Sequence, residues 1–170
     1  MKQVSKIISG GQTGSDIAGL RWAKKNGKAT GGFIPKGFKT EDGPKPQYRE
    51  KYGMLQTTSD GYASRTRLNI EHSDGTLIFG DPNSSGSAKT IRDCMSLDKP
   101  YFIVIWPYQG QKTNVIHMYD SSQQNMVFEF RDWIRQHDIK TLNVAGNRES
   151  VNPGVGVACY MFLDEALKDL

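Results

Sequence analysis

Residues 7–16 decide the fold, and they read Ile7-Ile8-Ser9-Gly10-Gly11-Gln12-Thr13-Gly14-Ser15-Asp16. A short apolar run ends here in a glycine-rich turn that leads directly into a helical pattern. The stretch therefore predicts a strand, a turn and the first turn of a helix. Its glycines let the backbone adopt a positive φ and approach a bound group closely. Unpaired N–H donors and the positive end of a helix dipole would then meet just past the strand, where proteins hold phosphate-like anions.

Two interpretations of this turn stay open. The helical pattern that follows it stops at Gly27, and Ser15 or Asp16 is expected to cap its first N–H groups. The spacing of the glycines matches neither G-x-G-x-x-G nor G-x-x-x-x-G-K-[ST]. The turn is thus either an anion-binding turn or a tight strand-to-helix turn whose glycines serve geometry alone.

Composition and length predict a single domain over residues 1–170. With 36% hydrophobic and 24% charged residues, the chain can bury a full core between a sheet and two helix layers. No apolar run reaches the length of a membrane span, and the N-terminus has no signal-peptide core, so we expect a cytoplasmic protein. Cys94 and Cys159 lie far apart and are expected to be buried, reduced thiols.

The net charge of +4 includes a basic stretch at residues 28–52, which holds six lysines and arginines against three acidic residues. Six minus three gives this stretch a net charge of +3. This stretch favours an anionic small molecule as partner, and it is too small and too poor in aromatic residues to indicate nucleic acid.

Strand and helix patterns alternate five times along the chain. This alternation predicts an α/β, Rossmann-like, doubly wound fold with a mainly parallel sheet of about five or more strands and helices on both faces. Residues 36–58 show no clear period and are expected to form a long loop across the top of the sheet. The strands are expected at residues 7–8, 29–35, 75–80, 101–106 and 141–146, and the helices at 15–26, 59–72, 88–97, 125–139 and from 155 onward.

Residues 107–124 form a polar connection to which we assign no chemistry. Within it, residues 115–119 could make a short strand at an edge of the sheet. His72, His117 and His137 have no second ligand at metal-binding spacing, so the sequence indicates no metal site.

Three loop junctions, at residues 10–16, 81–90 and 146–154, must emerge at the same end of a parallel sheet. In doubly wound folds the ligand binds at the carboxyl ends of the strands. The junctions therefore predict one pocket lined by amide donors and suited to an anion. The helix at 59–72 carries a polar stripe of Tyr62, Arg65, Thr66, Asn69 and Ser73, which either faces a ligand or subunit or is an exposed face.

Charged residues near these junctions could contact such a ligand. The chain shows no paired nucleophile and base, so a covalent mechanism is not favoured. Asp16 and Glu149 are the catalytic candidates, and Glu149 could act as a general base only with a raised pKa. Arg65, Lys36 and Arg148 could bind phosphate-like oxygens, and Asp16, Asp81 and Glu149 could orient a ribose, a pterin-like ring or a metal-bound water.

Ordered motifs over nearly the whole chain resemble one known family. The motifs are Ser9–Asp16, Pro35–Gly37, Glu41–Pro44, Tyr62-x-x-Arg65-Thr66-x-x-Asn69, Ser73–Thr76 and Asn143–Ser150. Together they resemble the molybdenum carrier family, a circularly permuted branch of a Rossmann-like superfamily. That superfamily also includes the cytokinin-activating phosphoribohydrolases and the DNA-processing protein A group.

The resemblance implies a Rossmann-like fold, a homo-oligomer, and a pocket for molybdenum cofactor, molybdate or a nucleotide-like ligand. By the same resemblance, residues 10–16 and 86–90 would line the anion pocket, with Arg65 and Asn69 beside it. The junctions and the resemblance together give these expected binding residues: Gly10, Gly11, Gln12, Thr13, Gly14, Asp16, Lys36, Arg65, Asn69, Ser85, Gly86, Ser87, Thr90, Gly146, Arg148 and Glu149.

Three functions are compatible with the sequence. Binding of a molybdopterin-type or nucleotide-type anion comes first, because donors are many and no catalytic pair is evident. Hydrolysis of a phosphorylated nucleoside or related ester, with Glu149 or Asp16 activating water, comes second. Thr90 stands where the related phosphoribohydrolases carry a glutamate, which argues against N-glycosidic hydrolysis. Binding of single-stranded nucleic acid comes last, because the basic stretch is small.

Overall fold

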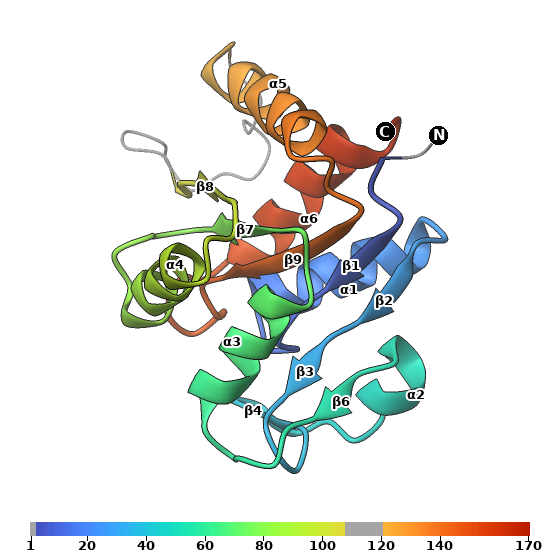
Figure 1. Cartoon of the computed structure of the whole chain (residues 1–170), viewed down its shortest axis with the longest axis vertical. Coiled ribbons are helices and arrows are strands. Elements are labelled where there is room, and N and C mark those ends of the chain that lie inside the picture. Colours follow the sequence, from blue (N-terminus) through green and yellow to red (C-terminus); the bar gives the residue numbers. More distant parts are fainter. Residues whose placement is uncertain (1–2, 108–120) are drawn as a thin grey trace.

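The computed structural model describes residues 3–107 and 121–170 (Figure 1). The edge strand predicted at residues 115–119 and His117 lie outside the described residues. The main sheet contains β1 (Lys6–Ile8), β2 (Ala29–Gly31), β7 (Gly75–Phe79), β8 (Tyr101–Val104) and β9 (Thr141–Gly146). The helices are α1 (Ser15–Lys25), α2 (Tyr48–Tyr52), α3 (Tyr62–Glu71), α4 (Ser85–Ser96), α5 (Ser121–Gln136) and α6 (Val155–Leu167).

The five main strands form one parallel sheet in the order β2-β1-β9-β7-β8. The predicted Rossmann-like fold is confirmed. If β9 is counted as the first strand, the order becomes 3-2-1-4-5, as in dinucleotide-binding folds. The C-terminal unit β9–α6 thus takes the place that the N-terminal unit has in those folds. The strand order reverses between β9 and β7, and ligands in such folds bind at that point.

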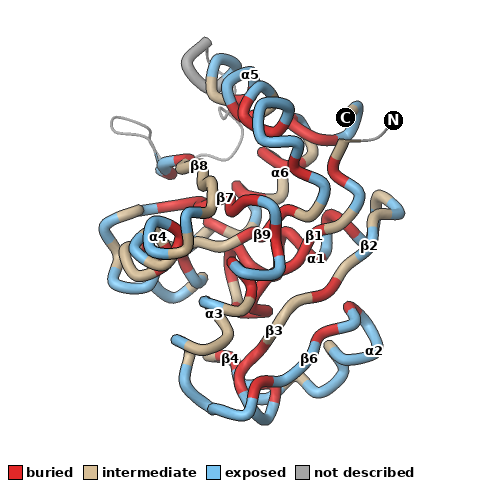
Figure 2. Tube along the Cα trace, viewed as in Figure 1, coloured by how far each residue is buried: buried red, intermediate tan, exposed pale blue. Residues whose placement is uncertain are grey.

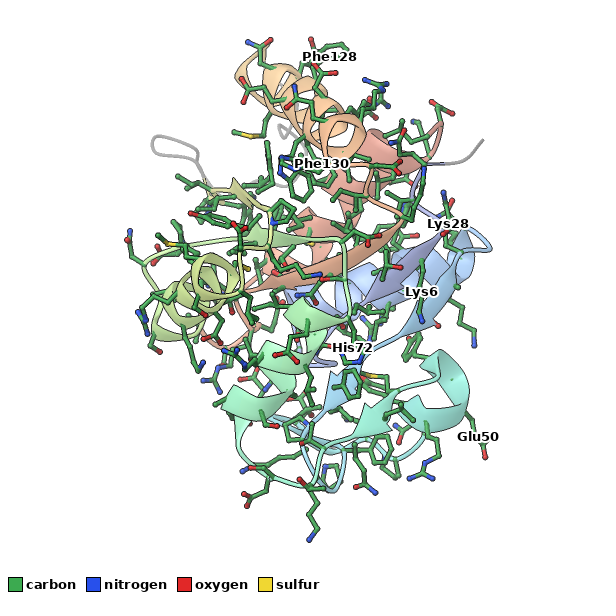
Figure 3. All side chains as sticks on the ribbon, in the orientation of Figure 1. Lys6, Lys28, Glu50, His72, Phe128 and Phe130 are labelled. Atoms are coloured by element: carbon green, nitrogen blue, oxygen red, sulfur yellow. The ribbon has the colours of Figure 1, made fainter. Side chains whose placement is uncertain are left out.

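Alternating residues of β9 serve the two faces of the sheet. Leu142 and Val144 join the main core with α1, α5 and α6, whereas Asn143 and Ala145 lie on the other face, together with residues of α3 and α4. Figure 1 shows the positions of α3 and α4 beside the sheet. Figure 2 shows that the central strands are largely buried. On α5, Phe130 points into the core and is fully buried, whereas Phe128 points outward and is 61% exposed (Figure 3). The core is therefore concentrated on one face, and the other face is more polar.

A small lobe replaces the long loop predicted at residues 36–58. It contains β3 (Phe33–Ile34), β4 (Lys39–Thr40), β5 (Gly43–Pro44), α2 and β6 (Leu55–Gln56). A separate apolar cluster of Ile34, Phe38, Tyr52 and Met54 packs this lobe against α1. The prediction of an irregular loop was wrong, because the lobe buries its own core.

The single strand predicted at residues 29–35 is broken at Gly32, which has φ of +122°. A Cβ built on Gly32 would lie 2.1 Å from the carbonyl oxygen of Ser9. Only glycine therefore allows the chain after β2 to turn away from its partner strand β1 at this point. After this break β3 pairs with β6 and leaves the main sheet.

The starts of four helices differ from the prediction. The α3 helix begins at Tyr62 and not at residue 59, and α5 begins at Ser121 and not at residue 125. Gly14, and neither Ser15 nor Asp16, is the N-cap of α1, and no side chain of residues 3–107 or 121–170 caps this helix. The α4 helix starts at Ser85, three residues before the predicted start, and Ser84 caps it by accepting a hydrogen bond from the Ser87 amide. None of the helices in the described part of the chain combines the length and the apolar character needed to cross a bilayer.

Candidate functional site

A pocket of about 400 Å³ lies between α3 and α4, at the carboxyl ends of β7 and β9. This is the point at which the strand order reverses. All three predicted junctions contribute lining residues: Gly10 from the first, Gly86 from the second and Arg148 from the third. The polar stripe of α3 faces the same pocket through Tyr62 and Arg65. Segments that lie far apart in the sequence thus meet at one concave site.

Ten of the sixteen expected binding residues line this pocket. They are Gly10, Gln12, Asp16, Arg65, Asn69, Ser85, Gly86, Thr90, Gly146 and Arg148. The other six lie outside its lining: Gly11, Thr13, Gly14, Lys36, Ser87 and Glu149. Among these, Lys36 is exposed on the small lobe and Ser87 is buried behind the first turn of α4.

The first turn of α4 is open toward the pocket. The amides of Ser85 and Gly86 have no acceptor among residues 3–107 and 121–170, and both residues are exposed. No atom of the described residues lies within 4 Å of a Cβ built on Gly86, so the space beside this residue is clear. Two N–H donors and the positive end of a helix dipole are therefore available to an anion.

Four amides of the turn at residues 10–16 are bound by the protein's own acceptors. Gly14 has φ of +78°, and a Cβ there would lie 2.3 Å from the carbonyl oxygen of Asn147, so this glycine serves close packing. The amides of the turn are occupied as follows: Gly11 by Ser9 Oγ at 3.2 Å, Gln12 by Asp16 Oδ2 at 3.3 Å, Thr13 by Gln12 Oε1 at 3.0 Å and Ser15 by the Asn147 carbonyl at 3.0 Å. These amides hold the turn together.

A buried ion pair forms one wall of the pocket. Arg65 Nη1 donates to the Gly10 carbonyl at 2.6 Å and lies 3.3 Å from Asp16 Oδ2. Burial raises the pKa of Asp16 above its ordinary value, although Arg65 acts to lower it. Burial lowers the pKa of Arg65 below its ordinary value, although the charge of Asp16 acts to raise it. Arg65 Nε is buried and has no hydrogen-bond partner in the described part of the chain.

Asn147 ties the loops together and is a residue that sequence reasoning missed. Its Oδ1 accepts from the Asp81 amide at 2.6 Å, and its Nδ2 donates to Ser84 Oγ at 2.9 Å. Oδ1 also accepts from Asn152 Nδ2 at 3.0 Å. No local pattern marks this asparagine, because its partners are more than sixty residues away or become neighbours only in the folded loop.

Glu149 is bound to the start of α6. Its carboxylate accepts from the Gly154 amide at 2.5 Å and from the Gly156 amide at 3.2 Å. These bonds satisfy amides that a helix start otherwise leaves without partners. Glu149 thus serves as a cap in this structure and lies outside the pocket lining.

Glu41, on the turn between β4 and β5, joins the small lobe to the loops at residues 10–16 and 146–154. It accepts hydrogen bonds from the hydroxyl groups of Thr13 and Ser150, and it lies 4.0 Å from Arg148 Nε. Although burial acts to raise it, these hydrogen bonds hold the pKa of Glu41 below its ordinary value. The small lobe is therefore fastened to the pocket through a charged carboxylate.

Nine lining residues were not among the expected binding residues: Tyr62, Thr66, Asp81, Ser84, Lys89, Asn143, Ala145, Asn147 and Val151. Helical spacing could have found Lys89, because it lies one turn after Ser85 on α4. Tyr62 was part of the predicted stripe, and its ring centre lies 5.1 Å from the Arg65 guanidinium and 6.0 Å from that of Arg148. The pocket thus has three cations, Arg65, Lys89 and Arg148, against the carboxylates of Asp16 and Asp81.

The described residues contain no group of three or more His, Cys, Asp or Glu side chains placed to hold a metal ion. Cys94 and Cys159 are both buried and unpaired, as predicted. Burial raises the pKa of Cys94 to about 11 and also raises the pKa of Cys159, which disfavours the nucleophilic thiolate.

Comparison with known proteins gives two matches. Residues 7–167 match the model of the circularly permutated YpsA SLOG family. The chain is also similar to the crystal structure of a putative molybdenum carrier protein from Syntrophus aciditrophicus, with 32% sequence identity and a TM-score of 0.83. That similarity covers 98% of this chain and 96% of the other. No curated protein gives a significant match.

Proposed function

Because the chain belongs to the circularly permutated YpsA SLOG family, we propose that it binds an anionic, molybdenum-containing small molecule in the pocket between α3 and α4. Molybdate and molybdenum cofactor are the two candidate ligands, and a nucleotide is the alternative. The name of the similar protein from Syntrophus aciditrophicus supports molybdenum as the cargo. The excess of cations over carboxylates in the pocket supports an anion.

The unpartnered Nε of Arg65 is the observation that carries this proposal. A buried polar group without a partner costs about 1–3 kcal/mol, and more when it is charged. An oxyanion between Arg65 and the first turn of α4 would supply the missing acceptor and would also occupy the amides of Ser85 and Gly86. Binding would thus recover a cost that the folded chain carries alone.

The size of the pocket favours a ligand larger than a bare oxyanion. Small-molecule pockets usually measure about 300–1,000 Å³. The volume of about 400 Å³ lies in this range and could hold a ring system attached to an anionic group. Tyr62, with its ring on the pocket wall, could contact such a ring. Molybdenum cofactor, with its phosphate-bearing pterin, therefore fits better than molybdate alone.

Thermal unfolding in the presence of candidate ligands tests the proposal. A ligand at about 100 times its Kd stabilises the folded state by about 2.7 kcal/mol. In a domain of this length, that gain should raise the Tm by roughly 5–10 °C. The probes are molybdate, molybdenum cofactor, inorganic phosphate and a panel of nucleotides. No shift with any of them would contradict the proposal.

Replacing Arg148 by methionine should weaken anion binding without unfolding the protein. Arg148 lines the pocket with 42% of its side chain exposed, and its ion pair with Glu41 is long at 4.0 Å. A hydrogen bond to a charged group contributes about 1.5–3 kcal/mol, so we expect the Kd for phosphate or molybdate to rise roughly tenfold to a hundredfold. Isothermal titration measures this change.

Arg92→Met is the matched control for Arg148→Met. Arg92 is exposed on α4 and does not line the pocket, and its replacement removes the same charge. If both variants lose the same amount of affinity relative to the wild type, net charge and not the pocket accounts for anion binding, and Arg148 has no direct role.

Binding ranks ahead of hydrolysis because the two catalytic candidates are engaged in other contacts. Glu149 caps α6, and Asp16 accepts from the Gln12 amide while paired with Arg65. Release of base or phosphate from nucleoside monophosphates over a long incubation would reverse this ranking. The homo-oligomer implied by the resemblance stays a prediction, which light scattering of the purified protein would test.

A further inference from the structure

The junction between β9 and α6 corresponds to the phosphate-binding turn of dinucleotide-binding folds. In those folds the diphosphate lies at the N-terminus of the helix that follows the first strand of the 3-2-1-4-5 order. Here that strand is β9 and that helix is α6. A ligand with a diphosphate would therefore be expected to reach the amides at the start of α6.

Three of those amides, at Gly154, Val155 and Gly156, are already occupied by the protein itself. Glu149 Oε1 lies 2.5 Å from the Gly154 nitrogen, and Glu149 Oε2 lies 3.2 Å from the Gly156 nitrogen. The Val155 amide donates to the Asn152 carbonyl at 3.1 Å. A carboxylate thus takes the position and the donors that a phosphate would use.

The start of α1 is closed in part. The Ser15 amide donates to the Asn147 carbonyl at 3.0 Å, and the Ile17 amide donates to the Gln12 carbonyl at 3.1 Å. In the described residues the neighbouring amides of Ser85 and Gly86 on α4 have no acceptor, whereas the other two helix starts each leave one amide without an acceptor, that of Asp16 on α1 and that of Val157 on α6. Ser85 and Gly86 both line the pocket, so α4 is the helix start that offers two neighbouring amides to a phosphate-like group there.

We propose that Glu149 is a specificity-determining residue that restricts the pocket to ligands with a single phosphate-like group and disfavours diphosphates. This inference rests on the proposed function, because it assumes that an anion binds at α4. The second phosphate of a diphosphate would find the α6 amides taken and would face the negative charge of Glu149. Both effects lower its affinity, because like charges repel and donors already in use give no new bonds.

Titration calorimetry with inorganic phosphate and inorganic pyrophosphate tests the inference. We expect the wild-type protein to bind phosphate more tightly than pyrophosphate, by at least about threefold. Glu149→Ala empties the position in front of α6, so pyrophosphate should gain at least about tenfold in affinity relative to phosphate. Glu149→Gln keeps the size of the side chain and removes its charge, and should give a smaller gain.

Two controls make the outcome decisive. Glu129→Ala removes one exposed acidic residue on α5, so it should improve both affinities equally and leave their ratio unchanged. Thermal unfolding without ligand shows whether each variant is folded, and Glu149→Gln replaces Glu149→Ala if the latter is not. Pyrophosphate binding by the wild type that equals or exceeds phosphate binding, or an unchanged ratio in a folded Glu149 variant, would overturn the inference. If the wild-type protein binds single oxyanions and the Glu149 variants bind pyrophosphate no better than it does, the inference fails and the proposed function stands. If the wild-type protein binds no anion at all, both are refuted.

Discussion

Replacing Arg65 by methionine is expected to destabilise the protein by about 3–5 kcal/mol at pH 7, because it leaves the Asp16 carboxylate buried without its partner. Both side chains are largely buried, at 12% and 10% exposed, and they lie 3.3 Å apart. The substitution also removes the bond from Arg65 Nη1 to the Gly10 carbonyl. Urea unfolding followed by circular dichroism measures the loss, and anion binding should disappear with it.

The cost of Arg65→Met should depend on pH in a defined direction. Burial already raises the pKa of Asp16 in the folded state, and loss of the Arg65 charge raises it further. A carboxyl whose folded pKa lies above its unfolded value holds more protons when folded, so stability falls as the pH rises through that interval. The variant should therefore be least stable relative to wild type at neutral pH, and the difference should shrink as the pH is lowered toward 4.

Two further variants test this explanation. Adding Asp16→Asn to Arg65→Met removes the buried charge and should restore most of the stability at pH 7. Arg67→Met, two residues along α3, breaks only an exposed pair with Glu71 and should cost less than about 1 kcal/mol. An Arg65→Met protein as stable as Arg67→Met would show that the buried pair does not support the fold.

Replacing Gly146 by alanine is expected to be the second severe change, at about 2–5 kcal/mol, from backbone strain and overpacking together. Gly146 ends β9 with φ of +147°. A Cβ there would lie 2.0 Å from the Phe79 carbonyl oxygen and 2.8 Å from Ser15 Oγ. Neither neighbour can move easily, because Phe79 belongs to β7 and Ser15 Oγ donates to that same carbonyl at 3.0 Å. The Tm should fall by roughly 10 °C.

Gly86→Ala is the matched control for Gly146→Ala. It also adds one methyl group to a glycine of the pocket lining, but no atom in the described part of the chain lies within 4 Å of the new Cβ. Alanine is the better helix former, so the Tm should stay the same or rise slightly. Equal Tm values for the two alanine variants would contradict the close packing of β9 against β7 and α1.

The arrangement of strands and helices was predictable because it follows from local patterns. Continuous apolar runs such as residues 75–80 mark strands that are covered on both faces, and period-3.6 patterns such as that of residues 125–139 mark helices. Val127, Phe130, Trp133 and Ile134 are all buried, as that period predicts. The small lobe was missed because its strands are two residues long and no pattern of that length can be read.

The candidate site was predictable only in part. Parallel strands place their carboxyl ends at one edge, so the junctions at residues 10–16, 81–90 and 146–154 could be grouped before any coordinates. Glycine content did not reveal which amides are available. Gly14 and Gly86 look alike in the sequence, yet the first packs against the Asn147 carbonyl and the second faces open space.

By itself, the sequence determined the fold class and the edge of the sheet at which the pocket lies, because both follow from the order and period of local segments. Only the tertiary structure decided which donors remain available there. It placed β9 between β1 and β7, closed the start of α6 with Glu149 and left that of α4 open. These contacts join residues that can be more than sixty positions apart, and a hydrogen bond between such residues depends on atomic distances that no local pattern encodes.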